Sequence, residues 1–88
     1  MRFEGTITRD GRFWLAEIPV LDAMTQGRTR KEALEMIADW LEIMVNRSNF
    51  EAEVHTRSRG EFEISGSDAA AMTAILVALV TEQAHRLP

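Results

Sequence analysis

The stretch that decides the fold runs from Asp10 to Glu42 and reads DGRFWLAEIPVLDAMTQGRTRKEALEMIADWLE. Its first two residues, Asp10-Gly11, separate two runs of β-favouring residues, which is the sequence signature of a tight hairpin turn. Pro19 lacks an amide donor and is expected to end the second strand. Met24-Thr25-Gln26 is extended enough for a short third strand before Gly27 turns the chain. The stretch therefore predicts a hairpin, a third strand and then a helix.

Apolar residues stand on both faces of the second predicted strand. Phe13 and Leu15 share one face, whereas Trp14, Ala16 and Ile18 share the other. This pattern is typical of a strand that other elements cover on both sides.

The helix is predicted to begin at Arg30, after a capping box formed by Thr29 and Glu32. In this motif the threonine hydroxyl accepts a hydrogen bond from the Glu32 amide, and the Glu32 carboxylate reaches back to the Thr29 amide. Apolar residues then cover more of the helix than a sheet alone would bury. A further surface is expected to cover three of them, which are Met36, Trp40 and Ile43.

In order and spacing, these features resemble the HicB family of antitoxins. The residues that carry the resemblance are Asp10-Gly11, Trp14, Glu17, Pro19, Leu21, Thr25-Gln26-Gly27, Thr29 and Glu32-Ala33. One departure is Asp22-Ala23, where family members often have Pro-Gly. The resemblance implies a trimmed ribonuclease H-like fold and a function as an antitoxin that neutralises a small, basic, mRNA-cleaving toxin of the HicA type, with autoregulation of its operon.

Two further strands are indicated beyond the helix, over residues 50–56 and 61–65, because apolar and charged residues alternate in both. The two strands are expected to form a second hairpin; alternatively, only the fourth strand pairs with the main sheet. The expected fold is α+β: a small antiparallel sheet of three to four strands packed on one central helix, in the order β-β-β-α-β, plus a C-terminal helix. Residues 1–66 form the expected α+β domain, and residues 67–88 the C-terminal helix.

The last helix is predicted from about Asp68 to His85 and is apolar almost all round. Such a helix needs burial on more than one side, so we expect symmetric association into a dimer or larger homo-oligomer. The alternative is a helix that folds back on its own sheet. The expected contact residues are Met36, Trp40, Ile43, Met72, Ile75, Leu76 and Leu79.

Two arrangements of ionisable residues could in principle form chemical sites. The first is a metal site on the second hairpin, but these residues fit better the charged outer face of an edge strand; they are Glu51, Glu53, His55, Glu61 and Glu63. The second is a ribonuclease H-type centre, which needs carboxylates converging on two metal ions, and Asp10, Asp22 and Asp39 are too scattered to converge. We therefore predict no catalytic residue, no metal and no cofactor.

Composition favours a basic protein partner over nucleic acid. The 88-residue chain has a net charge of −4 and no cysteine, which fits a cytoplasmic protein. The N-terminus lacks a signal-peptide pattern, and Ala69 to Val80 is too short to span a membrane. DNA binding is doubtful, because the chain ends without the second helix of a helix-turn-helix. Either a DNA-binding module has been lost or the chain is a short family member.

The sequence is compatible with an antitoxin-like protein and with an oligomeric interaction or regulatory module of the same fold without a toxin. A third possibility, a small hydrolase, is disfavoured by the scattered carboxylates. If the chain is an antitoxin, an acidic ridge on the central helix is the expected toxin contact; otherwise the ridge is a solvated face. It consists of Glu32, Glu35, Asp39 and Glu42. Such a ridge would attract a basic partner by electrostatic steering.

Overall fold

The computed structural model describes residues 1–46 and 49–86, and shows an α+β fold with one antiparallel sheet and two helices. The chain opens with the predicted hairpin, in which strand β1 (Arg2–Asp10) pairs with strand β2 (Phe13–Ile18). Gly11 in the turn has a φ of 61°, a conformation that glycine adopts readily. The Asp-Gly signal therefore located the first turn correctly.

The third strand forms as expected, after one short turn of 3-10 helix. This turn, η1 (Pro19–Leu21), begins at the proline that ends β2 and closes at Asp22, whose φ of 52° is left-handed. Aspartate is among the non-glycine residues that tolerate this region best. Strand β3 (Ala23–Gly27) then pairs antiparallel with β2.

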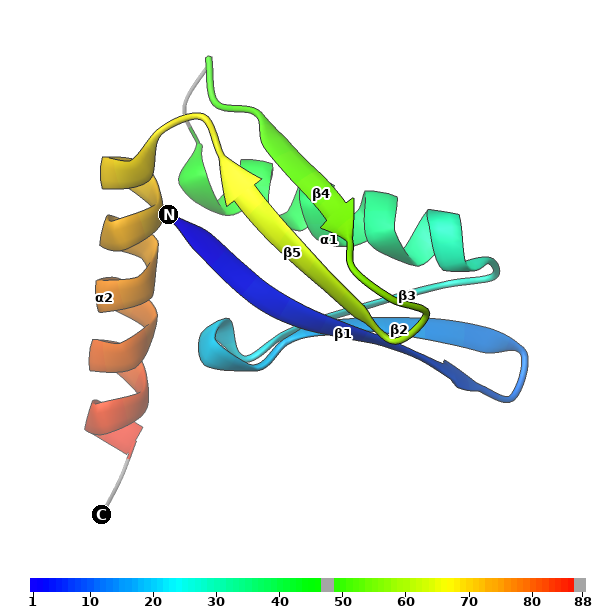
Figure 1. The fold of residues 1–88 in the computed structure, drawn as a ribbon. Helices are drawn as coiled ribbons and strands as arrows, with labels where there is room; N and C mark the ends of the chain where they lie inside the picture. Colours follow the sequence, from blue (N-terminus) through cyan, green and yellow to red (C-terminus); the bar gives the residue numbers. More distant parts are fainter. Residues whose placement is uncertain (47–48, 87–88) are drawn as a thin grey trace.

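The second half of the sheet contains one strand more than predicted. Strands β4 (Ala52–Thr56) and β5 (Glu61–Gly66) form a second hairpin, and β5 also pairs with β1. The strand order is β3-β2-β1-β5-β4, so the sheet has five strands and β1 is central (Figure 1). The expectation of three to four strands was wrong because both strands of the second hairpin join the sheet.

Helix α1 (Arg30–Val45) covers one face of this sheet. It ends at Asn46, which adopts the left-handed conformation common after a helix. The side chains that α1 buries are Ala33, Leu34, Ile37 and Leu41. They pack with apolar residues from the same face of the strands, including Phe3, Ile7, Ala16, Ile18, Phe62 and Ile64. Among the described residues no helix lies on the other face of β2, which carries Phe13 and Leu15, and Phe13 is 39% exposed. The prediction that both faces of this strand are covered was therefore wrong.

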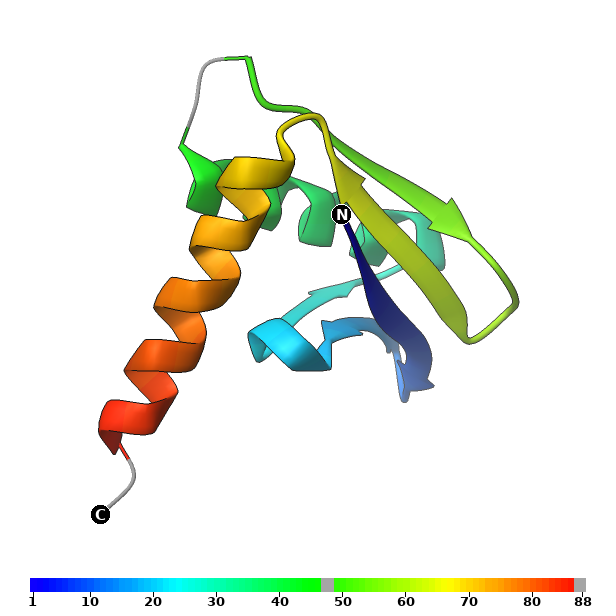
Figure 2. The same ribbon diagram turned by 60° about the vertical axis from the view of Figure 1, so that its left-hand side comes forward.

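Helix α2 (Ala69–Arg86) crosses one end of the sheet and contacts α1 and η1. It begins one residue after the predicted start, where the Asp68 carboxylate accepts a hydrogen bond from the Ala71 amide at 3.1 Å. Its first turns enter the main core, because Met72 is fully buried and Ile75 is 8% exposed. The remainder of the helix extends past the sheet (Figure 2).

Candidate functional site

Thr25-Gln26-Gly27 and Thr29, a motif in the stretch that resembles the HicB family, connect strand β3 to helix α1. The Thr25 hydroxyl donates a hydrogen bond to the carbonyl oxygen of Ala33 at 3.0 Å, and Gly27 lies so close to the helix that an added Cβ would stand 2.5 Å from the Ala33 nitrogen. No side chain larger than hydrogen fits at Gly27 without a backbone shift. These residues of the motif therefore build the fold rather than a binding surface.

The capping box forms in part. The Thr29 hydroxyl accepts a hydrogen bond from the Glu32 amide at 3.0 Å, as predicted. The Glu32 carboxylate instead accepts from the Arg28 amide, at 3.4 Å, so the predicted return bond to Thr29 is replaced by one to the preceding residue. Glu32 thus already has a structural role at the helix start.

The acidic ridge on α1 divides into two structural residues and two more accessible ones. Glu42 accepts a hydrogen bond from the Ala52 amide at 3.2 Å and so ties the end of α1 to the start of β4. Glu35 lies 3.8 Å from Lys31, in an ion pair whose side chains are 62% and 88% exposed. Asp39 is exposed. Of the four predicted toxin contacts, Glu35 and Asp39 are therefore the ones best placed to meet a partner.

The residues expected to mediate oligomerisation fall into two groups. Met72 and Ile75 belong to the core of the single chain, and Leu76 and Leu79 are half-buried. On α1, Trp40 is half-buried, but Met36 is 47% exposed and Ile43 is 73% exposed. The burial of Met72 and Ile75 is therefore explained within one chain, and Met36 and Ile43 are the predicted contact residues most accessible to a second copy. The prediction from the sequence assumed that a single chain offers no layer for α2, whereas the first turns of α2 pack into the core.

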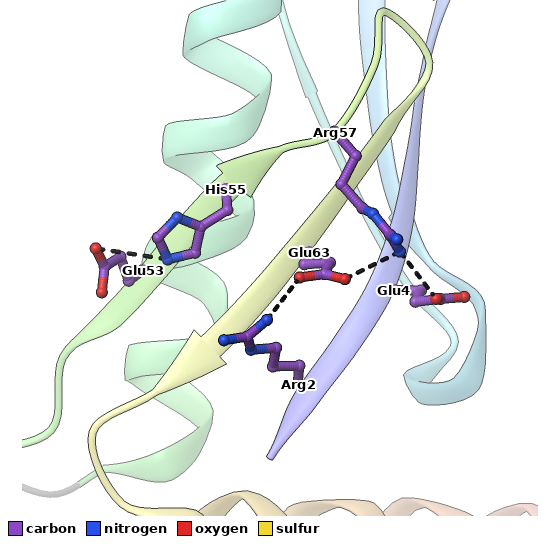
Figure 3. Close-up of polar contacts among 6 residues, drawn as sticks. All are labelled: Arg2, Glu4, Glu53, His55, Arg57 and Glu63. Carbon is purple, nitrogen blue, oxygen red and sulfur yellow. Dashed lines mark hydrogen bonds and ion pairs between the residues drawn. The ribbon is translucent and has the colours of Figure 1, made fainter.

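The face of the sheet opposite α1 carries a chain of ion pairs (Figure 3). Arg57 lies 2.9 Å from Glu63 and 3.3 Å from Glu4, and Arg2 contacts the other carboxylate oxygen of Glu63 at 3.3 Å. The Glu63 side chain is only 18% exposed, so this carboxylate is held between two guanidinium groups. These ion pairs connect β1 to the β4–β5 hairpin. Glu63 therefore has a structural role, because both of its carboxylate oxygens are ion-paired.

The residues weighed as a metal site are spread over the same face. His55 lies 3.5 Å from Glu53. The Glu63 carboxylate instead forms ion pairs with Arg2 and Arg57. The Glu51 amide donates a hydrogen bond to the Ser67 hydroxyl. Within residues 1–46 and 49–86, no three histidine, cysteine, aspartate or glutamate side chains are grouped so as to hold a metal ion. The aspartates weighed for catalysis lie on separate elements, with Asp10 ending β1, Asp22 following η1 and Asp39 on α1.

Sequence reasoning missed an apolar strip at the other end of this open face. Phe13 and Met24 are 39% and 60% exposed, and Leu15 is half-buried. Their alternation with inward residues was visible in the sequence, but it was interpreted as burial beneath a second layer. The structure leaves the strip uncovered by any element that it describes.

No protein-family model, curated protein or solved structure matches the chain. No helix in the part of the chain that the structure describes has the length and apolar character needed to cross a membrane.

Proposed function

We propose that the chain is an antitoxin-like protein that binds and neutralises a small basic HicA-type toxin. The family resemblance in the Asp10–Glu42 stretch suggests this class of partner. One structural observation carries the choice of surface: acidic and apolar side chains share the exposed face of α1. Glu35 and Asp39 supply the charge, and Met36 and Ile43 stand beside them at helical spacings of three, four and seven residues.

The combination of acidic and apolar side chains on this face of α1 is more typical of a protein-binding surface than of a surface that only faces solvent. A protein interface combines a buried apolar centre with a polar rim, and Met36 and Ile43 would form such a centre. The carboxylates of Glu35 and Asp39 would attract the basic RNA-binding surface of a toxin and raise the rate of encounter. Covering that surface would block mRNA cleavage, so this chain needs no catalytic group of its own.

The test first asks whether a short basic open reading frame lies beside this gene, because its absence would favour the toxin-free module. The product of such a frame is then purified, with RNA cleavage and association rate as readouts. Wild-type protein is expected to stop the cleavage. The double reversal Glu35→Lys and Asp39→Lys should slow association about tenfold at low salt, because steering can change association rates by 10-fold or more. The difference should shrink between roughly 50 and 500 mM salt, where the screening length falls from above 10 Å to below it.

A matched control reverses Asp10 and Glu61, which are exposed on the strands rather than on α1 and change the total charge by the same amount. This variant should associate nearly as fast as wild type. If both double variants slow association equally, only the total charge matters and α1 is not the contact. If wild-type protein leaves cleavage unaffected, the antitoxin proposal fails in favour of the toxin-free oligomeric module.

A further inference from the structure

Strand β4 has one free edge, because the strand order places it last in the sheet that the structure describes. The Ser67 amide donates to the Glu51 carbonyl and the Arg57 amide to the Glu61 carbonyl. In an antiparallel ladder such pairs recur at every second residue, so Ala52, Val54 and Thr56 direct their backbone groups away from β5. The Ala52 amide is already taken by Glu42. The free edge therefore presents Val54 and Thr56 as donors.

A groove of about 530 Å³ runs between this edge and α1. Its apolar lining comes from Leu34, Ala38 and Val54, and its rim near the start of α1 carries Arg30, Lys31 and Glu35. Beyond the opposite end of the groove, Glu42 reaches Ala52. The surface along β4 is thus apolar in the middle, with charges of both signs near the start of α1 and the Glu42 carboxylate at the other end.

We propose that the free edge of β4 binds the same edge of a second copy of this chain, antiparallel and about a two-fold axis at Val54. The Val54 residues of the two copies would exchange backbone hydrogen bonds, and each Thr56 amide would donate to Ala52 of the other copy. The Val54 side chains point toward the helix-covered face, so each would enter the groove of the other copy. This association does not rest on the antitoxin proposal, although Glu35 lines the groove and also belongs to the proposed toxin contact.

Charge complementarity selects a second copy as the occupant. Pairing about Val54 sets Glu53 of each copy directly opposite His55 of the other, in the closer type of antiparallel pair. An imidazole N–H donates well to a carboxylate. The same axis brings the end of one groove that carries Arg30, Lys31 and Glu35 toward the Glu42 end of the other. Charged edges usually prevent strand addition, but here acid and base alternate so that the edge matches itself.

The experiment measures the mass of the purified protein by sedimentation from low micromolar to submillimolar concentration. Wild-type protein should form a dimer as concentration rises, and the amides of Val54 and Thr56 should then exchange hydrogen more slowly. His55→Glu places two carboxylates opposite each other across the edge and should raise the dimer dissociation constant about tenfold or more. Combining it with Glu53→Lys restores opposite charges and should restore the dimer.

Val54→Pro supplies a second disruption, because it removes an amide donor that faces away from β5, and prolines are tolerated on edge strands. Circular dichroism confirms that each variant is folded. Gln26→Glu, a charge change on the opposite edge strand, is the matched control and should leave the dimer intact. Val77→Asp changes α2, where Val77 is 58% exposed, and distinguishes the two surfaces.

The proposal is overturned by a wild-type monomer at all concentrations. It is also overturned if His55→Glu dimerises as tightly as wild type, or if Val77→Asp abolishes the dimer while the β4 variants preserve it. Failure of the charge-swapped double variant to recover while folded would reject the register centred on Val54.

Discussion

The substitution Met72→Ala tests whether α2 belongs to the core of a single chain. Met72 is fully buried, and its sulfur and the ring of Phe50 pack over Gly66, where an added Cβ would stand 2.5 Å from that sulfur. Truncation removes the buried thioether and leaves a cavity beneath the helix. Buried methionine-to-alanine changes cost about 2–5 kcal/mol, so we expect a loss of about 3 kcal/mol in the free energy of unfolding.

Urea unfolding followed by tryptophan fluorescence gives this free energy directly. A loss of about 3 kcal/mol corresponds to a melting temperature lower by roughly 12–24 °C in a domain of this size. All variants are compared at one low protein concentration, because self-association would shift the apparent stability. Met72→Leu keeps most of the side-chain volume and should cost less than about 1.5 kcal/mol.

Val77→Ala is the control on the same helix, because Val77 is 58% exposed. It should change stability by less than about 0.5 kcal/mol, as surface substitutions usually do. The packing described for α2 would be refuted by a Met72→Ala loss below about 1 kcal/mol, or by a Val77→Ala loss as large as that of Met72→Ala. The second result would mean that the side of α2 that carries Val77 is buried as well.

Three further predictions concern single contacts. Thr29→Ala removes the cap of α1 and should cost about 1 kcal/mol in urea unfolding, whereas Thr29→Ser should cost much less. Gly5→Ala should destabilise the fold by about 1–3 kcal/mol, because its Cβ would lie 2.7 Å from the Glu17 carbonyl oxygen; unchanged stability would contradict the close packing of β1 on β2. Glu42→Ala should speed hydrogen exchange at the Ala52 amide selectively, since that amide loses its acceptor.

Local signals predicted the elements well because the residues that define them are neighbours in the chain. The Asp10-Gly11 turn, the break at Pro19 and the Thr29 cap each depend on a few consecutive residues, and the structure contains all three. Helix α2 likewise begins within one residue of the predicted position. Hydrophobic periodicity also identified the strands of the second hairpin.

Arrangement in space was harder to predict because it depends on pairings between distant residues. Nothing near Phe3 indicates that Ile64 will be its neighbour in the sheet. The role of Met72 was missed for the same reason, since the core that buries it includes residues far away in sequence, such as Phe50. At the candidate site, charge spacing identified Glu35 and Asp39 as accessible acids, but only the structure shows that Glu42 is occupied by an amide of β4.

The central position of β1 has a consequence for the order of folding. Strands β1 to β3 and helix α1 make contacts that are short in sequence, whereas the pairing of β1 with β5 closes a loop of most of the chain. Long-range closures of this kind are slow because of their entropy cost. We expect the first half to collapse early and the β4–β5 hairpin to dock late. Until the β4–β5 hairpin docks, a newly made chain exposes one edge of β1, which later becomes the central strand of the sheet.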